Sequence, residues 1–474
     1  MSISNLPAFE LSKAIHTKKV SCVEVMQATL KRISEVNPAH NVIVNLVDVD
    51  ELISQAVTHD RLLSKGESKG WLHGIPQAIK DLSNSCGIPT TKGSVLLKNF
   101  VPSEDGLMAA RIREAGAIFI GKTNTPEFGL GSHTFNEVFG ATRNASDTSK
   151  TAGGSSGGAA VALALNLLSV ADGSDFMGSL RNPAGWNNVY GLRPSQGRVP
   201  MWPTLDSYVA QLGTEGPMGR TVRDVAMMLE TQAGFDPRSP LSIAEKFQWS
   251  AATNRTIDTA PRVGWLGDLN GYLSTDEGIL QACQLGLKRL DSIGCVVEPI
   301  ELGFSPAAVW DAWLVWRAAL VASSLAPIAS VEKNRSIIKP EALWEFESAK
   351  KFTASDFMKA SATRSQFYQH LRALFERYDF LVLPSAQVWP FDIELRWPKQ
   401  IAGRSMDTYH RWMETVIYAT FAGLPAMSLP SGFSEVSATR SRALPNGLQI
   451  IGKPQGDLAL LQLAAAYEQT ISSK

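Results

Sequence analysis

Three glycine-containing segments of this chain carry side chains that could do covalent chemistry, at residues 74–81, 153–158 and 173–181. They supply a lysine, Lys80, and two separated serines, Ser155 and Ser179. A serine hydroxyl is a weak nucleophile until a neighbouring base removes its proton. A lysine can be that base only when it is neutral, and burial lowers its pKa from a reference value of about 10.4. The three segments therefore predict a serine nucleophile whose base is a lysine.

Two other interpretations of these segments are weaker. A histidine base would be more usual, but of the seven histidines only His73 and His133 lie in segments with chemical character, and no Ser-His-Asp triad is assigned. The glycines of segment 153–158 could also cradle a phosphate. A phosphate-binding loop, however, needs Lys followed by Ser or Thr after its last glycine, and Ala159 and Ala160 stand there instead.

The elements that must position these residues alternate between helices and strands. Lys80 follows an apolar pair and is expected to point inward from the end of a buried strand. The Ala- and Leu-rich stretch 157–168 predicts a buried helix, followed by a short strand at 169–171. A helix over about 355–378 likewise leads into a strand at 380–384. This repeated alternation indicates an α/β fold whose sheet is covered by helices on both faces.

The bulk composition narrows the class of protein. With 474 residues, 44% of them hydrophobic and 19% charged, the chain can bury a sizeable core. Basic and acidic residues number 45 each, so the net charge of zero gives no indication of nucleic-acid or membrane-surface binding. The four cysteines form no CxxC pair and are expected to be free thiols in a reducing compartment. Without a secretory signal or an apolar run of about 20 residues, the expectation is a soluble cytoplasmic protein.

The three segments, in this order and wording, resemble the amidase signature family. The resemblance extends over nearly the whole chain through further blocks at 121–128, 140–144, 191–200, 216–222, 423–426 and 447–452. It implies one large domain over 1–474, built on a central twisted mixed β-sheet with helices on both faces. The core catalytic segment would span about 70–235, and a more variable region facing the substrate about 236–400.

The resemblance also implies roles for the three side chains. Lys80 would be the general base, Ser179 the nucleophile, and Ser155, after a cis peptide bond, the relay that passes the proton between them. A hydroxyl suits a relay because it both accepts and donates a hydrogen bond. The backbone N–H groups of Phe176, Met177, Gly178 and Ser179 would form the oxyanion hole. Asp175, Arg181 and Ser156 would support this arrangement.

The substrate pocket is less well specified. Met177 stands where the family usually has glycine, and Asn187 and Asn188 replace smaller residues, so the shape of the pocket is in question. The chain has 12 tryptophans, several of them in variable regions, and Trp186, Trp316 and Trp389 are candidates for the pocket wall. An aromatic, mostly apolar pocket predicts a preference for hydrophobic or aryl amides, anilides or carbamates, with esters also accessible.

The leading hypothesis is therefore an amidase that works through a covalent acyl-enzyme on a small amide or carbamate. One alternative is an amidotransferase subunit that acts on glutamyl-tRNA, and another is a catalytically silent binding protein on the same fold. No cofactor is expected, and no group of residues has metal-ligand spacing. No nucleic-acid or membrane partner is expected, and a homodimer is the assembly considered.

Overall fold

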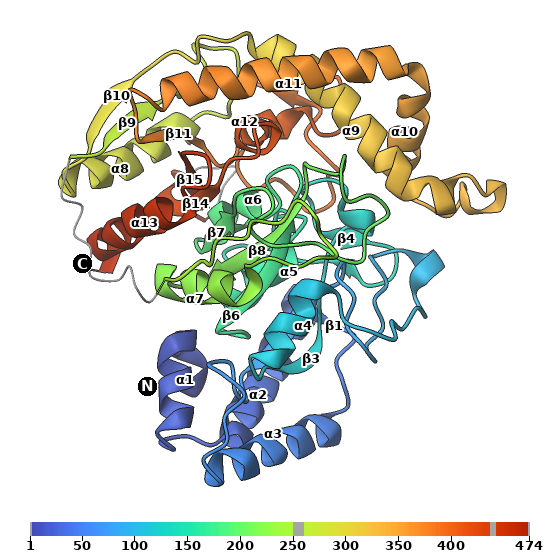
Figure 1. Ribbon diagram of the computed structural model, residues 1–474, viewed down its shortest axis with the longest axis vertical. Coiled ribbons are helices and arrows are strands. Elements are labelled where there is room, and N and C mark those ends of the chain that lie inside the picture. Colours follow the sequence, from blue (N-terminus) through green and yellow to red (C-terminus); the bar gives the residue numbers. More distant parts are fainter. Residues whose placement is uncertain (1, 250–259, 437–441, 473–474) are drawn as a thin grey trace.

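An eight-stranded mixed sheet runs through the centre of the computed structural model (Figure 1). Its strands in spatial order are β10 (Val296–Pro299), β9 (Arg262–Trp265), β11 (Phe380–Pro384), β15 (Pro445–Gly452), β14 (Ala426–Phe433), β7 (Tyr190–Arg193), β8 (Thr214–Gly219) and β6 (Val170–Asp175). The pairs β10–β9 and β9–β11 are parallel, and all the later pairs are antiparallel. The structure describes residues 2–249, 260–436 and 442–472.

Helices cover both faces of this sheet, which confirms the predicted α/β architecture. Successive side chains of a strand point to opposite faces. In β11, Phe380 and Val382 belong to one hydrophobic core, whereas Leu381 and Leu383 belong to a second. The helices are α1 (Ala8–His16), α2 (Cys22–His40), α3 (Val49–Ser64), α4 (Leu107–Glu114), α5 (Gly157–Ala164), α6 (Arg181–Trp186), α7 (Val222–Gln232), α8 (Ile279–Ser292), α9 (Pro306–Ala329), α10 (Pro340–Ser348), α11 (Ala354–Leu374), α12 (Ile417–Phe421) and α13 (Asp457–Ser472).

A second, three-stranded sheet places Lys80 beside the end of the large one. It consists of β1 (Ile43–Val44), β3 (Ile118–Thr123) and β2 (Pro76–Lys80), in that order. Two hydrogen bonds connect β2 to β6: Gln77 Nε2 donates to the carbonyl of Val170 at 3.0 Å, and the N–H of Lys80 donates to Asp172 Oδ2 at 3.1 Å. Two smaller hairpins pair β4 (Phe135–Asn136) with β5 (Gly140–Ala141), and β12 (Gln400–Ile401) with β13 (Arg404–Ser405).

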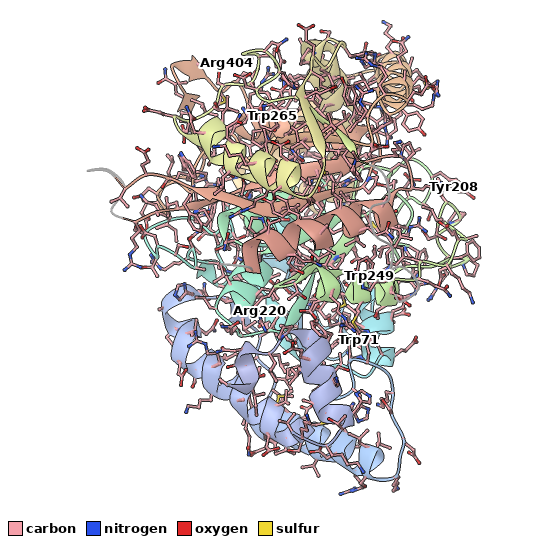
Figure 2. All side chains as sticks on the ribbon, turned by 90° about the vertical axis from the view of Figure 1, so that its left-hand side faces the viewer. Trp71, Tyr208, Arg220, Trp249, Trp265 and Arg404 are labelled. Atoms are coloured by element: carbon pink, nitrogen blue, oxygen red, sulfur yellow. The ribbon has the colours of Figure 1, made fainter. Side chains whose placement is uncertain are left out.

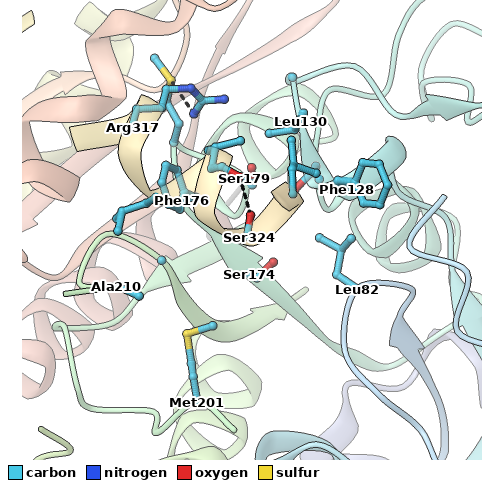
Figure 3. Close-up of a pocket in the computed structure, with 18 of the residues that line it drawn as sticks. Leu82, Phe128, Leu130, Ser174, Phe176, Ser179, Met201, Ala210, Arg317 and Ser324 are labelled. Atoms are coloured by element: carbon cyan, nitrogen blue, oxygen red, sulfur yellow. Dashed lines mark hydrogen bonds between the residues drawn. The ribbon is translucent and has the colours of Figure 1, made fainter. Parts of the chain in front are cut away.

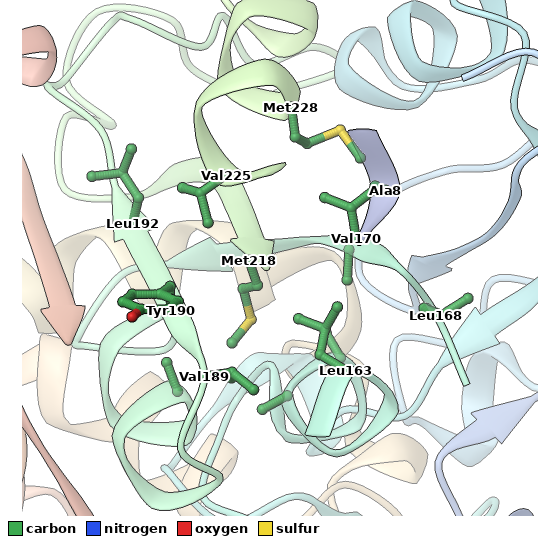
Figure 4. Close-up of a cluster of buried hydrophobic side chains, with 14 of the residues drawn as sticks. Ala8, Leu163, Leu168, Val170, Val189, Tyr190, Leu192, Met218, Val225 and Met228 are labelled. Atoms are coloured by element: carbon green, nitrogen blue, oxygen red, sulfur yellow. The ribbon is translucent and has the colours of Figure 1, made fainter. Parts of the chain in front are cut away.

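The first core packs around β6, β7 and β8. Figure 4 shows Val170, Leu192 and Met218 from these strands meeting Leu163 of α5 and Val225 of α7. All five side chains are fully buried. This packing fixes β6, and with it the segment that follows β6 and carries Ser179.

Some element boundaries differ from the sequence prediction. The strand at 380–384 is present as predicted, but the helix predicted over 157–168 ends at Ala164. Asn166 has a left-handed backbone with φ of 60°, which asparagine tolerates better than most residues and which ends the helix there. The strand predicted at 169–171 extends to Asp175, because β8 pairs along its whole length. α11 stops at Leu374, four residues before the predicted end at 378.

α9 is the one helix, within the described ranges, that is long and apolar enough to cross a membrane. Half of its apolar stretch is buried inside the protein, and Trp310 and Trp313 are 2% and 0% exposed. Such burial is typical of a core helix, for which length and composition are the same. All four cysteines (Cys22, Cys86, Cys283 and Cys295) are free thiols, as predicted.

Candidate active site

Lys80 ends β2 with its amine enclosed by hydroxyl groups. The side chain is fully buried. Its Nζ donates to Ser155 Oγ and Ser156 Oγ, both at 2.8 Å, and to Ser174 Oγ at 3.0 Å. No salt bridge reaches this amine from any described carboxylate. The structure thus brings Lys80 and Ser155 together, as the sequence predicted, and adds Ser174 to the cluster.

The electrostatic environment of Lys80 favours the neutral amine. Burial lowers the pKa of Lys80 to about 7, and the carboxylates of Asp172, Asp175 and Glu215 oppose this only partly. A group with this pKa is neutral in about half of the molecules at neutral pH. The amine can therefore accept a proton without a histidine.

Asp172 holds the end of β2 in place. Its carboxylate accepts the backbone N–H of Lys80, at 3.1 Å from Oδ2. Burial raises the pKa of Asp172 to about 6, against the effect of that hydrogen bond and of Lys122. Sequence reasoning missed Asp172, although it directly precedes the third glycine-containing segment, where an acidic residue in an apolar strand is unusual.

The loop that carries Ser155 has the backbone conformation that the family resemblance implies. The Gly154–Ser155 peptide bond is cis. At Gly153, with φ of 76°, a Cβ would lie 2.6 Å from Asn182 Oδ1, so a side chain cannot be accommodated there. The N–H of Ser156 donates to the carbonyl of Ser179 at 3.2 Å, which connects this loop directly to the other serine.

Asp175 organises the turn that contains Ser179. Its carboxylate accepts the N–H of Gly178 at 2.9 Å and that of Leu180 at 3.2 Å. Arg181 binds the same carboxylate through Nε and Nη2, each at 3.0 Å, and Arg193 approaches it at 3.4 Å. Burial by itself would raise the pKa of Asp175, but the two arginines and these hydrogen bonds lower it to about 2. Asp175 therefore remains charged and the turn remains fixed.

This turn corrects one part of the predicted oxyanion hole. The N–H of Gly178 already donates to Asp175, so it is not available to a substrate in this arrangement. The N–H groups of Phe176, Met177 and Ser179 have no acceptor among the described residues. Three of the four predicted donors are thus unpaired next to the Ser179 hydroxyl.

A cavity of about 240 Å³ opens in front of the three serines Ser155, Ser174 and Ser179 (Figure 3). Its other walls are mostly apolar and come from distant parts of the chain: Leu82, Phe128, Gly129, Leu130, Gly131, Phe176, Met177, Met201, Ala210, Gly213, Arg317, Leu320, Val321, Ser324, Leu325 and Met413. Between Met201 and Ala210 the chain forms an exposed loop, with Tyr208 projecting from the molecular surface (Figure 2). The polar groups are concentrated at one side of an otherwise apolar space.

The three tryptophans proposed for the pocket wall lie elsewhere, which corrects that expectation. Trp186 is fully buried and stacks on Trp412 with a ring separation of 5.9 Å. Trp316 packs on Phe357 at 4.6 Å, and the indole N–H of Trp389 donates to the carbonyl of Glu277 at 2.9 Å. These large side chains fill the spaces between helices and sheet, where they bury more apolar surface than they could beside a cavity.

The departures from the family pattern divide in the same way. Met177 lines the cavity, so it does affect the shape of the site. Asn187 instead donates to the carbonyls of Ala152 and Pro183, both at 2.8 Å, and Asn188 lines a separate surface cavity. Sequence reasoning also missed Ser174 and Arg317. Ser174 stood inside the third glycine-containing segment, whereas no local signal marked Arg317.

No group of three or more His, Cys, Asp or Glu side chains could hold a metal ion in the part of the chain that is described. The family model named Amidase matches residues 24–461. Among curated proteins, the chain is 31% identical to a glutamyl-tRNA(Gln) amidotransferase subunit of Trichormus variabilis, over 98% of this chain and 97% of that protein.

Solved structures agree with this match. A bacterial aryl acylamidase of the amidase signature enzymes superposes with a TM-score of 0.89 at 28% identity, covering 98% of this chain and 96% of that one. The corresponding glutamyl-tRNA(Gln) amidotransferase subunit of Thermotoga maritima superposes with a TM-score of 0.79 at 26% identity, covering 99% and 95%.

Proposed function

This chain belongs to the amidase family of amide-hydrolysing enzymes, and we propose that it cleaves amides of hydrophobic or aryl small molecules through a seryl acyl-enzyme. The observation that carries the proposal is the buried amine of Lys80, 2.8 Å from the Ser155 hydroxyl, at the wall of a cavity that also exposes Ser179. This arrangement combines a neutral base, a relay and a nucleophile without a histidine.

In the proposed acylation, Ser179 Oγ attacks the amide carbonyl while its proton passes to Ser155 and the Ser155 proton passes to Lys80. The carbonyl oxygen becomes an oxyanion, for which the unpaired N–H groups of Phe176, Met177 and Ser179 are the candidate donors. Preorganised donors of this kind matter greatly, since loss of one typically costs about 2.7–4 kcal/mol of transition-state stabilisation.

Collapse of the tetrahedral intermediate breaks the C–N bond. Lys80 then returns its proton through Ser155 to the departing amine, which leaves as a neutral molecule. Water attacks the acyl-enzyme by the same route in reverse, with Lys80 again accepting a proton through Ser155, and the acid is released. Carbamates and esters pass through similar tetrahedral oxyanions, so the proposal includes them as accessible substrates. The serine route needs no Lewis acid and hence no cofactor.

The apolar walls of the cavity support the proposed substrate class. Leucine, methionine, valine and phenylalanine side chains line most of it. Small-molecule sites of this kind gain affinity from apolar contact and orientation from a few polar groups. The solved relative named as an aryl acylamidase agrees with this preference, although the aromatic wall proposed here comes from Phe128 and Phe176 rather than from tryptophan.

A second candidate function is that of an amidotransferase subunit, favoured by the names of the curated relatives. Such an enzyme would take ammonia from glutamine, a small and highly polar substrate. The mostly apolar cavity is poorly matched to it, and we rank this candidate second.

The test is kcat/KM of the isolated chain for acetamide, glutamine, an aryl amide series and aryl carbamates. We expect the aryl members to be preferred by at least about tenfold, because apolar contact distinguishes them. A higher value for glutamine or acetamide than for every aryl member would reject the proposed substrate class. Labelling with an aryl sulfonyl fluoride, followed by peptide mass analysis, should place the adduct on Ser179, and an adduct elsewhere would reject the nucleophile.

A further inference from the structure

Arg317 is a charged side chain in a cavity whose other described lining residues are all uncharged. It projects from α9, is only 3% exposed, and lies on the same side of the cavity as Phe176 (Figure 3). Its guanidinium lies 5.5 Å from the Phe176 ring and 3.7 Å from Met177 Sδ, beside the turn that carries Ser179. The proposed acyl-enzyme mechanism assigns no role to this group.

The partners of Arg317 use only part of its hydrogen-bonding capacity. Nε donates to Glu345 Oε1 at 2.6 Å, and Nη2 donates to the Tyr409 hydroxyl at 2.7 Å. The contact from Nη1 to Met177 is with sulfur, a weak acceptor. A guanidinium has five N–H groups. One N–H on each terminal nitrogen therefore has no acceptor among the described residues, in an apolar space where an unpaired donor is unfavourable.

The charge on Arg317 is already balanced. Burial would lower the pKa of Arg317, but Glu345 and Tyr409 raise it above its usual range, so the guanidinium stays protonated. Glu345 is 1% exposed and receives hydrogen bonds from both Arg317 and Tyr409 through the same oxygen. A second carboxylate brought into the cavity would be repelled by Glu345. A neutral oxygen acceptor would meet the unpaired N–H groups without that repulsion.

We propose that Arg317 binds a neutral oxygen acceptor, such as a ketone, ether or second carbonyl, on the apolar group of the substrate that fills the cavity. This inference rests on the proposed function and narrows its substrate class. The substrates would be hydrophobic amides that carry one uncharged acceptor, and Glu345 and Tyr409 would hold the guanidinium in position to bind it.

The experiment compares matched substrates that differ only by a ketone in place of a methylene group. One pair varies the acyl part, with 4-oxopentanoyl anilide against pentanoyl anilide. The other pair varies the amine part of one common acid, with 4-acetylbenzylamide against 4-ethylbenzylamide, where the intervening methylene insulates the leaving nitrogen from the ketone. Succinyl anilide, a carboxylate of similar length, tests the anionic alternative.

In the wild-type chain we expect the ketone member of at least one pair to have a kcat/KM about tenfold or more above that of its partner. The ratio should fall towards one in Arg317→Met combined with Glu345→Gln, which avoids leaving a buried unpaired carboxylate. Arg317→Lys keeps the charge and should also lose most of the ratio, because the fork geometry is lost. Arg220→Met removes an arginine outside the cavity and should leave the ratio unchanged.

A merely structural role for Arg317 would lower kcat/KM for both members of a pair and leave their ratio intact, which would overturn the inference. Ratios near one in both wild-type pairs, or a preference for succinyl anilide over the ketone, would overturn it as well. Hydrolysis of the anilides and benzylamides without discrimination rejects only the role of Arg317. If none of them is hydrolysed, the proposed function is rejected, and this inference with it.

Discussion

The two sides of the candidate site differ in chemistry and in how the chain builds them. Behind Ser179 lies a polar cluster in which the Lys80 amine contacts three serine hydroxyls, all supplied by two strand ends and one loop. In front lies an apolar cavity whose walls come from stretches as far apart as Leu82 and Met413. The comparison indicates that rate and selectivity are separable here: the polar cluster should set the rate for every substrate, and the cavity should decide among substrates.

The largest effect should come from the residue where the two sides meet. Ser179→Ala removes the nucleophile, and we expect kcat/KM to fall by at least about 10⁴-fold for every substrate. Thermal unfolding should be nearly unchanged, because the substitution removes a single oxygen atom. Ser324→Ala is the matched control, since Ser324 also lines the cavity but donates to the Val321 carbonyl in its own helix, and it should stay active. Retention of more than about 1% activity by Ser179→Ala would contradict the assignment.

Within the polar cluster, Lys80 and Ser155 should act as one unit. Lys80→Met and Ser155→Ala are each expected to lower kcat/KM by about 10³-fold or more, and the double variant by little more than the worse single one. The reason is that a relay without its base, or a base without its relay, cannot move the proton. Multiplying effects in the double variant would instead show two independent contributions, and near-full activity of Lys80→Met would eliminate it as the base.

The pH dependence should report the same base. Burial lowers the pKa of Lys80 to about 7, and only the neutral amine accepts a proton. The value of kcat/KM should therefore rise about tenfold per pH unit below 7 and level off above it. The nearby Asp172 carboxylate raises the pKa of Lys80, so Asp172→Asn should move the inflection to lower pH. An optimum near pH 5 in the wild type, or a shift to higher pH in the variant, would refute this account.

The smallest effect should come from the cavity side and should be selective. Ala210 lies in the loop between Met201 and Gly213 and lines the cavity. Ala210→Leu should narrow the cavity and lower kcat/KM about tenfold for bulky aryl amides, with less than about a twofold change for a small amide. The pH profile should not move, because the polar cluster is untouched. An equal loss for small and large substrates would show that the two sides are not separable.

Much of the polar cluster could be predicted from the sequence because its residues lie in short segments with strong local constraints. The glycine at 153 and the Asp175–Arg181 pair specify tight backbone turns, so the positions of Ser155 and Ser179 follow from local sequence. The family resemblance gave their roles. Ser174 and Asp172 were overlooked for a different reason: their importance comes from a neighbour on another strand, which local patterns do not reveal.

The substrate side could not be predicted in the same way. Tryptophan content suggested an aromatic wall, but a count of large apolar residues does not tell which of them face the core and which face a cavity. Trp186 and Trp316 pack inside, whereas smaller side chains such as Leu320 and Val321 face the substrate space. The predicted oxyanion donors had a similar limit, because only the folded turn shows that the N–H of Gly178 is already bound to Asp175.

The sequence by itself therefore determined the family, the α/β architecture and the side chains proposed for the chemistry, since these depend on hydrophobic periodicity and on local turns. Only the tertiary structure decided the burial that lowers the pKa of Lys80 and the shape of the cavity. It also decided the placement of Arg317 beside Met177, 140 positions away along the chain. Burial and long-range contact arise when distant segments pack together, and no local stretch of residues contains that information.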